Sequence, residues 1–402
     1  MDELIPNLRD ERVQGAVKNL LAYSIVILLV PLGSMFLLKR FMFEDLLGYS
    51  ADEALTYSAV VAVVLVHVRN AHDPPVYLGF GNNMEIDNLY RLRSIFLPLG
   101  KIGGKPAWLN PQYLPTTADL QCNVCHKAMC FLIQIYATGD CDPPHAFHRT
   151  LFVFICRDPE CSVNNNASNI AVFRCCLPRV NPFYSFDGPM DPDLDGDVPD
   201  PRLPEDAPNT CRICGCYASK KCGRCGSAWY CCRDHQALDW TSGHKQVCGS
   251  DVPDLITPTN PSNLFLFKEY GIEMDQEYQN DSFKTEEVET AVADQRNDQK
   301  FERFHRFLNL NPTQILRYQR SGIPLIATDR APVPGGAPDC ERCGAPRCFE
   351  LQLMPHLLSL IGVDQIGRSI DWASVYVYTC SQTCAVENHG YIKEFVCKQD
   401  FC

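Results

Sequence analysis

The sequence predicts a multidomain protein in which a short α-helical membrane hairpin precedes a β-rich, zinc-containing α+β domain. That domain is expected to consist of two related halves, interrupted by a small zinc finger. Three observations predict this arrangement: an apolar, cysteine-free start over residues 1–70, a dense Cys/His block over 211–248, and a cysteine pattern that occurs on each side of that block. With 402 residues, the chain is long enough for several domains with their own cores.

Charge and cysteine content narrow the classes of function. The net charge of −12 disfavours electrostatic binding to the phosphate backbone of nucleic acids, so no direct nucleic-acid binding is expected. Many of the 23 cysteines stand in C-x2-C, C-x3-C or C-x4-C pairs, which is ligand spacing for zinc. Because zinc-binding thiols must stay reduced, the cysteine-rich part is expected in the cytosol or nucleus. Redox catalysis is a weaker alternative, since each pair has a second pair placed to complete a metal site.

Changes in composition divide the chain into six segments. Two segments rich in acidic and polar residues cannot build a core and are interpreted as linkers, at 185–209 and 249–300. The others are the membrane hairpin at 1–70, a first β-rich half at 75–184, the finger at 211–248 and a second β-rich half at 301–402.

Apolar and aromatic runs predict the secondary structure of the two halves. CFLIQIY, TLFVFIC, SVYVYTC and YIKEFVC are typical of strands, and NLFLFKEYGIEM (263–274) is expected to add a short strand to a neighbour. The run FERFHRFLNLNPTQILRYQR (301–320) predicts an amphipathic helix that is interrupted near Pro312.

The Cys/His block is the strongest single signal. Two knuckles are followed by a Cys-x3-His and a His-x3-Cys pair: Cys211/Cys214, Cys222/Cys225, Cys231/His235 and His244/Cys248. Eight ligands supply two tetrahedral zinc sites, which so short a segment needs because its apolar core is too small to hold it. The block resembles the MYND zinc finger over its whole length, including the YC before the third pair and the DW before the last helix.

The MYND resemblance implies how the ligands are shared. It implies interleaved sites, one on Cys211, Cys214, Cys231 and His235 and the other on Cys222, Cys225, His244 and Cys248. Cys216 and Cys232 fall outside the pattern and are interpreted as spare thiols. The family also implies binding of short proline-containing peptides. Some of its members are lysine methyltransferases, but this chain has no recognisable cofactor-binding stretch.

An internal repeat flanks the finger. Residues 122–134 (CNVCHKAMCFLIQ) and 340–352 (CERCGAPRCFELQ) share the pattern C-x2-C-x4-C-F-x2-Q, and each runs into a strand that ends in a second cysteine pair. Such paired knuckles are typical of zinc ribbons, so one further zinc is predicted in each half. The expected ligands are Cys122, Cys125, Cys156 and Cys161, and Cys340, Cys343, Cys380 and Cys384. Chance similarity between cysteine-rich segments is the alternative.

Two β-rich halves around a MYND finger resemble the programmed cell death protein 2 family. The matching stretches run from VYLGF at Val76 to EFVCKQDF near the C-terminus, and include GGKPAWLNP, FHRTLFVFICR and IDWASVYVYTC. The resemblance implies a non-enzymatic zinc-binding adaptor or chaperone that binds a newly made, basic small-subunit ribosomal protein and supports ribosome biogenesis. An acidic chain suits such a client. The expected binding site is a groove between the two halves, surrounded by the acidic linkers and by aromatic side chains such as Trp108, Tyr113 and Trp372. Taken singly, each of these aromatics is more typical of a core residue than of a contact.

The N-terminal segment does not fit that family. LLAYSIVILLVPLGSMFLL (20–38) is long and apolar enough to span a membrane, and no small-residue cleavage site follows it. A second apolar stretch, 57–68, is followed by Arg69 and as a helix covers ~18 Å, against ~30 Å of bilayer hydrocarbon. Together they resemble the two-span membrane factor that assembles the vacuolar proton-ATPase in the endoplasmic reticulum, with its second span cut short.

This second resemblance leaves an alternative function open. The chain is then an endoplasmic reticulum membrane factor for proton-pump assembly, with the pump's membrane sector as partner and the zinc module as the passenger of a fusion or read-through product. For the fused chain, we expect two crossings that leave the zinc domains facing the cytosol, where thiols stay reduced. Without the hairpin, cytoplasm and nucleus are expected.

Overall fold

In a computed structural model, the described parts of the chain are residues 74–139, 141–189, 191, 206–249, 265–277, 298–331, 336–365 and 369–401. The chain divides into two compact units, Met1–Asp73 and Pro74–Cys402. The expected membrane hairpin at 1–70 and much of both acidic linkers lie outside the described residues. Within the described ranges, no helix combines the length and the apolar character that crossing a membrane requires.

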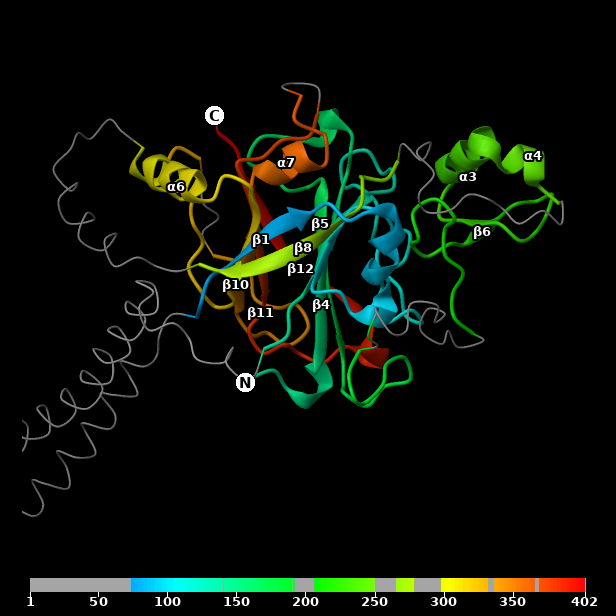
Figure 1. The fold of residues 1–402 in the computed structure, drawn as a ribbon, viewed down its shortest axis with the longest axis horizontal. Helices are drawn as coiled ribbons and strands as arrows, with labels where there is room; N and C mark the ends of the chain where they lie inside the picture. The colour runs from blue at the N-terminus through cyan, green and yellow to red at the C-terminus, as the bar shows by residue number, and fades with distance from the viewer. Residues whose placement is uncertain are drawn as a thin grey trace, which may run out of the picture. The chain divides into compact units, whose positions relative to one another are not determined.

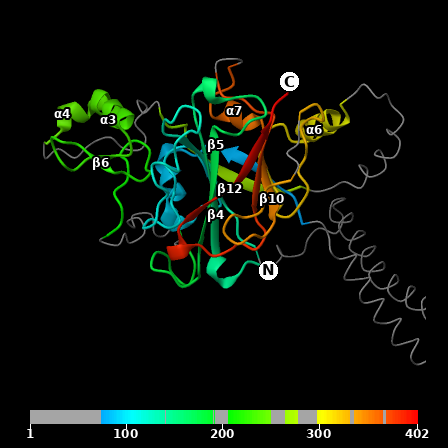
Figure 2. The same ribbon diagram turned by 180° about the vertical axis from the view of Figure 1, so that it is seen from behind.

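Ten strands of the second unit close into one barrel. Its strand order is β1-β8-β2-β3-β4-β5-β12-β11-β10-β9, and β9 pairs with β1 to close it. The strands are β1 (Tyr77–Asn82), β2 (Gly100–Ile102), β3 (Cys130–Tyr136), β4 (His148–Ile155), β5 (Ile170–Leu177), β8 (Tyr270–Gln276), β9 (Gln314–Tyr318), β10 (Arg347–Leu353), β11 (Ser374–Cys380) and β12 (Tyr391–Gln399). Neighbouring strands are antiparallel, and Figures 1 and 2 show β4, β5 and β12 from opposite sides.

The two halves exchange a strand. Strand β8, which follows the finger in sequence, pairs with β2 of the first half, whereas β1 from the start of the unit pairs with β9 of the second. The halves are further joined along β5–β12 and β1–β8. The expected groove between them is therefore wrong, because hydrogen-bonded strands close both seams. Trp108 and Trp372 are only 6% and 2% exposed and belong to the core, while Tyr113 is exposed.

The pairing registers support the internal repeat. Gln134 of β3 lies opposite Phe152 of β4, and Gln352 of β10 lies opposite Tyr376 of β11. Both hairpins also shift register directly after the phenylalanine of the repeat. Chance similarity between cysteine-rich segments does not explain two hairpins with the same register and the same irregularity.

The repeated glutamine makes the same contacts in both halves. Gln134 accepts a hydrogen bond from the N–H of Ala107 (2.8 Å) and donates one to its carbonyl (3.2 Å). Gln352 does the same with Leu325, at 2.8 and 3.0 Å. Each glutamine lies 27 residues after the residue that it holds. The repeat therefore begins before its first cysteine, in the segment that leads to each knuckle.

Two apolar clusters hold the barrel together. Strands β4 and β5 are buried along their whole length, because both of their faces are covered. One face packs in a cluster that includes Leu151, Val153 and Val377. The other face contributes Phe152 to a second cluster, which also contains Tyr230 of the finger. The finger thus shares a core with the barrel.

The helices partly match the sequence prediction. Helix α6 (Gln299–Leu310) is N-capped by Asp298, whose carboxylate accepts the N–H of Phe301 at 2.8 Å. The residues after Pro312 do not continue this helix but form β9, whereas the run at 263–274 supplies β8, the expected added strand. Helix α7 (His356–Leu360), labelled in Figure 1, contributes Leu357 and Leu358 to an apolar cluster inside the barrel.

Short elements complete the unit. The finger contains β6 (Lys220–Lys221), β7 (Trp229–Tyr230), α3 (Arg233–Asp239) and α4 (Lys245–Val247), with a π-helical turn at Trp240–His244 between its two helices. Turns of 3-10 helix lie at Ile86–Leu92, Ser94–Phe96, Pro144–Ala146, Pro159–Cys161 and Glu387–His389.

Candidate metal centres

Among the residues that the structure describes, four groups of side chains have donor atoms close enough together to hold a metal ion. Within each group, one donor atom from each residue lies within 4.8 Å of the others. The groups are Cys122, Cys125, Cys156 and Cys161; Cys211, Cys214, Cys231 and His235; Cys222, Cys225, His244 and Cys248; and Cys340, Cys343, Cys380 and Cys384. The fold therefore brings together the members of every ligand set expected from the sequence. The groups are called here the first barrel cluster, the two finger clusters and the second barrel cluster.

The sulfur separations fit tetrahedral zinc and do not fit disulfides. One Sγ–Sγ distance of 3.7 Å occurs in each group, for Cys125–Cys156, Cys214–Cys231, Cys222–Cys248 and Cys340–Cys384. Four sulfurs at ~2.3 Å from a zinc ion lie ~3.8 Å apart, whereas a disulfide bond is ~2.05 Å long. The cysteines that the structure describes are all free of disulfide bonds.

The two histidines present different ring nitrogens. The Nδ1 atom of His235 lies 3.5 Å from Cys211 Sγ and 3.0 Å from Cys231 Sγ. In the other finger cluster it is Nε2 of His244 that lies 3.7 Å from Cys225 Sγ. Each ring thus directs one nitrogen at its cluster, as a zinc ligand does.

One backbone turn builds all four C-x2-C knuckles. The residue after the second cysteine donates its N–H to the carbonyl of the first at 2.7–2.9 Å: His126 to Cys122, Gly215 to Cys211, Gly226 to Cys222 and Gly344 to Cys340. That residue has a φ of 57°, 71°, 69° and 71°, respectively. Glycine adopts this left-handed conformation without the steric cost that other residues carry. Glycine therefore favours this turn in three of the four knuckles. In the knuckle of the first barrel cluster, the same conformation is adopted by His126, which has a Cβ.

At one cysteine in each of two clusters, Cys225 and Cys340, hydrogen bonds favour the thiolate form that binds zinc. A hydrogen bond with the Ser227 side chain lowers the pKa of Cys225 to about 5. Burial opposes ionisation of Cys340, but the backbone N–H groups of Cys343 and Arg342 lower its pKa to about 7.

The finger is docked on the barrel. The indole Nε1 of Trp108, from the segment before β3, donates a 2.7 Å hydrogen bond to the carbonyl of Gly215 in the first finger knuckle. A methyl group added to Gly215 would lie 2.9 Å from Cβ of Lys105, so the two backbones approach closely there. On the other side, the rings of His235 and Phe265 meet edge to face with centroids 4.1 Å apart. The finger is therefore part of the packed unit.

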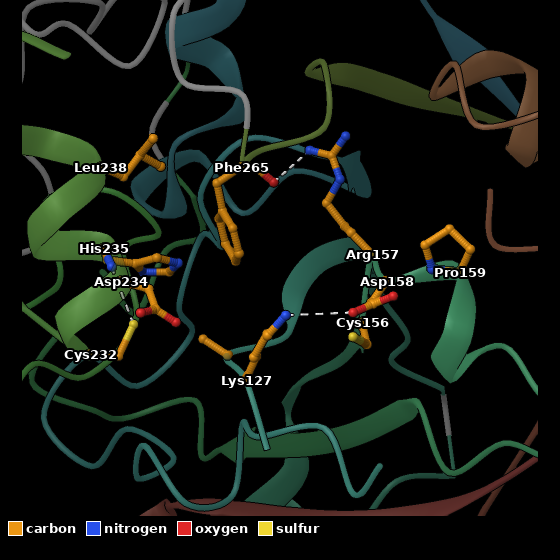
Figure 3. A pocket seen from close by; sticks show the side chains of 11 residues that line it. Lys127, Cys156, Arg157, Asp158, Pro159, Cys232, Asp234, His235, Leu238 and Phe265 are labelled. Atoms are coloured by element: carbon orange, nitrogen blue, oxygen red, sulfur yellow. Dashed lines mark hydrogen bonds and ion pairs between the residues drawn. The ribbon is translucent and has the colours of Figure 1, made fainter. Parts of the chain in front are cut away.

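A pocket of about 390 Å³ lies between the finger and the first barrel knuckle. Figure 3 shows Phe265 between His235 of helix α3 and the loop that begins at Cys156. The pocket is thus lined by one residue of the first barrel cluster, Cys156, and by one residue of a finger cluster, His235. An ion pair of 3.6 Å between Lys127 and Asp158 crosses its rim. The pocket combines an aromatic wall with a charged rim.

Cys232 has a role that the sequence interpretation missed. It belongs to no metal group among the described residues, as expected, but its Sγ accepts the N–H of His235 at 3.4 Å and caps helix α3. Its position directly before the helix was the available signal. Cys216 is buried, with its Sγ 3.7 Å from the carbonyl oxygen of Cys214.

Comparisons with known proteins cover almost the whole chain. The family profiles for the N-terminal and C-terminal domains of programmed cell death protein 2 match residues 75–191 and 298–400. The MYND finger profile matches 211–248, and a VMA21-like domain matches 15–68. A MYND finger implies zinc binding. No solved structure matches the chain.

Individual relatives agree with the profiles. Programmed cell death protein 2 of Bos taurus is 39% identical over 352 residues, which cover 81% of this chain and 96% of the relative. The Caenorhabditis elegans homologue of the vacuolar ATPase assembly integral membrane protein VMA21 is 72% identical over 68 residues, 17% of this chain and 67% of the relative. The probable 20S rRNA accumulation protein 4 of Schizosaccharomyces pombe is 33% identical over 161 residues, 36% of this chain and 38% of the relative. The chain therefore belongs to the programmed cell death protein 2 family and carries a VMA21-like segment at its N-terminus.

Proposed function

We propose that this chain is a zinc-binding chaperone that holds a newly made, basic small-subunit ribosomal protein during ribosome biogenesis. The observation that carries the proposal is the family match, which spans 81% of the chain and 96% of the relative. A second relative is named for the accumulation of 20S rRNA, which supports a role in ribosome biogenesis. The proposal includes no catalytic step.

The charge of the chain supports a basic client. The chain has 48 acidic and 36 basic residues, and its net charge is −12. Opposite net charges accelerate encounter and allow the carrier to compete with RNA for the basic surface of the client. Because the barrel interior is filled by its own side chains, the client is expected to bind the outer surface of the domain.

We also propose that all four clusters hold zinc, two ions in the finger and one in each half. The donor sets and sulfur separations support this assignment. At each site, zinc would supply structural cross-linking, since metal-binding energy is folding energy in small cysteine-rich segments. In each barrel half, the knuckle precedes the first strand of a hairpin, and the second cysteine pair lies at the end of its second strand. A metal ion would therefore join the two chain ends of that hairpin.

The finger offers a separate surface for proline-containing peptides. A pocket of about 310 Å³ on the finger is lined by Arg233, Gln236 and Trp240, among others. Proline rings stack well on aromatic side chains, and the glutamine amide can hydrogen-bond an extended backbone. We assign this pocket to the peptide ligands that the MYND resemblance implies.

Co-purification tests the chaperone proposal. The full chain, tagged at its C-terminus and expressed in cells, is purified in zinc-containing buffer, and bound proteins are identified by mass spectrometry. One basic small-subunit ribosomal protein is expected in stoichiometric amount, and the complex should weaken as salt rises. Recovery of folded, zinc-loaded chain without any ribosomal protein would refute the proposal.

The second candidate function is assembly of the vacuolar proton-ATPase at the endoplasmic reticulum membrane. The observation that favours it is the 72% identity of the N-terminal segment to a VMA21 homologue. An antibody to the C-terminal half distinguishes the cases on a blot of endogenous protein. A band near 45.3 kDa supports a fused, membrane-attached chain, whereas a smaller band alone indicates a separate programmed cell death protein 2 relative.

A further inference from the structure

Two buried cations occupy equivalent positions in the two halves of the barrel. Arg174 of β5 lies opposite Leu151 of β4, and Lys398 of β12 lies opposite Val375 of β11. Leu151 and Val375 are themselves equivalent, because each pairs with the residue that follows the repeated glutamine. Arg174 is 0% exposed and Lys398 is 2% exposed. A buried charge is unfavourable unless it is paired, so the neighbours of Arg174 and Lys398 indicate what each cation stabilises.

Arg174 reaches the second barrel cluster from the first half. Its Nη2 lies 3.7 Å from the sulfur of Cys384, and its Nη1 donates to the carbonyl of the same residue at 3.3 Å. Its Nε donates to the carboxylate of Glu394 at 2.7 Å. That carboxylate in turn accepts the backbone N–H of Cys380 at 3.2 Å. One arginine of the first half thus contacts both closing ligands of the second half, directly and through Glu394.

Lys398 makes the reciprocal contact from the second half. Its Nζ lies 3.2 Å from the hydroxyl of Ser162, which directly follows Cys161 of the first barrel cluster. It also pairs with Asp400 at 3.2 Å, and Asp400 accepts the N–H of Asn165 at 2.6 Å. Lys398 therefore fixes the chain after the ligand, whereas Arg174 reaches a ligand sulfur itself.

The chemistry of the cluster explains why an arginine suits this place. Four thiolates outweigh the charge of one zinc ion, so the second barrel cluster carries net negative charge when it is loaded. Burying that charge is unfavourable unless hydrogen-bond donors compensate it. A guanidinium is always charged and presents several N–H donors in a fixed plane, so it can bind a sulfur, a carbonyl and a carboxylate together.

We propose that Arg174 is a positioning residue of a zinc centre formed by Cys340, Cys343, Cys380 and Cys384. The arginine compensates the charge of the centre and orients Cys384, so that retention of zinc in the second half depends on a strand of the first half. The inference rests on the proposed zinc occupancy of the barrel. Residues around metal ligands commonly change metal affinity by about 10–100-fold when replaced.

Site-resolved thiol labelling of the full, zinc-loaded chain tests the proposal. The chain is exposed to N-ethylmaleimide and a chelator, and the labelling rate of each cysteine is read by peptide mass spectrometry. Arg174→Lys keeps a positive charge for Glu394 but shortens the reach to the sulfur. We expect it to raise the labelling rates of Cys343 and Cys384 about ten-fold. The rates of Cys125 and of the finger cysteines should stay unchanged.

Two further variants separate positioning from general stability. Lys398→Met, at the equivalent position of the other half, should leave the labelling of Cys384 unchanged. Arg174→Met removes the guanidinium but leaves Glu394 paired with Arg347 at 3.1 Å, and should again accelerate labelling in the second barrel cluster alone. Unchanged rates in Arg174→Lys, or an equal increase at all four clusters, would overturn the proposal. Wild-type barrel cysteines that label equally fast with and without added zinc would overturn it at the step of occupancy.

Discussion

Arg149 and Glu350 form a bidentate ion pair that is fully buried inside the barrel, with Nη2 and Oε2 2.6 Å apart. Arg149 comes from β4 of the first half and Glu350 from β10 of the second, so the pair links the halves. The hydroxyl of Tyr318 also donates to the carboxylate, at 3.1 Å. Burial raises the pKa of Glu350, but Arg149 outweighs this effect and holds the pKa below its usual value.

Replacing Glu350 by Gln should destabilise the protein by about 3–5 kcal/mol, because the charge of Arg149 would remain buried without compensation. Chemical denaturation of the zinc-loaded chain measures the loss. The double variant Arg149→Met with Glu350→Met removes both charges and should be less destabilised than Glu350→Gln alone. If this double variant loses as much stability as Arg149→Met and Glu350→Met lose together, the two side chains do not stabilise each other and the ion pair has no such role.

Replacing Gly344 by Ala should destabilise the second barrel knuckle by about 1–2 kcal/mol, since the φ of +71° at this position is unfavourable for any residue with a Cβ. No atom lies within 4 Å of the added methyl group, so the effect isolates backbone conformation. Gly223→Ala in the finger is the control, because that site is equally open and has no positive φ. Thermal unfolding should separate the two variants; equal midpoints would contradict the shared knuckle turn.

Replacing Trp108 by Phe should loosen the finger, because the carbonyl of Gly215 loses its indole donor at a cost of about 1–3 kcal/mol. Hydrogen exchange of residues 211–216 is the measurement, and faster exchange is expected. Trp372→Phe provides the matched control, since its indole donates to Met354 within the barrel at 3.3 Å. If both variants leave the finger equally protected, the contact does not hold the finger on the barrel.

Two glycosylation sequons report on topology. Asn166-Ala-Ser lies in an exposed loop of the first half, and Asn280-Asp-Ser lies outside the described residues. We expect neither asparagine to be glycosylated when the full chain is expressed in cells, because zinc-binding thiols need a reducing compartment. A mass shift that is sensitive to glycosidase would place the C-terminal part in the lumen and contradict a cytosolic zinc domain.

The spacing of cysteines and histidines along the sequence predicts most ligands of the metal sites, because a knuckle is formed by residues that are close in sequence. The strand exchange between β1 and β8 has no such local signal, since strand partners are decided by packing over distances of about two hundred residues. The sequence predicts a helix where β9 forms; Ile315 and Leu316 fit a helix or a strand equally well in so short a run, so the pattern alone cannot separate the two. The acidic partners of Arg149 and Arg174, Glu350 and Glu394, come from the opposite half, so sequence neighbours could not reveal these ion pairs.

The zinc content of the purified full chain tests the proposed occupancy of the four clusters most directly. Elemental analysis of protein prepared without added chelator should give four zinc ions per chain, two from the finger and one from each barrel half. Cys125→Ser should lower the content to three and destabilise the first half, because the hairpin loses its cross-link. Two zinc ions per wild-type chain, in folded protein, would contradict both barrel centres while leaving the finger intact.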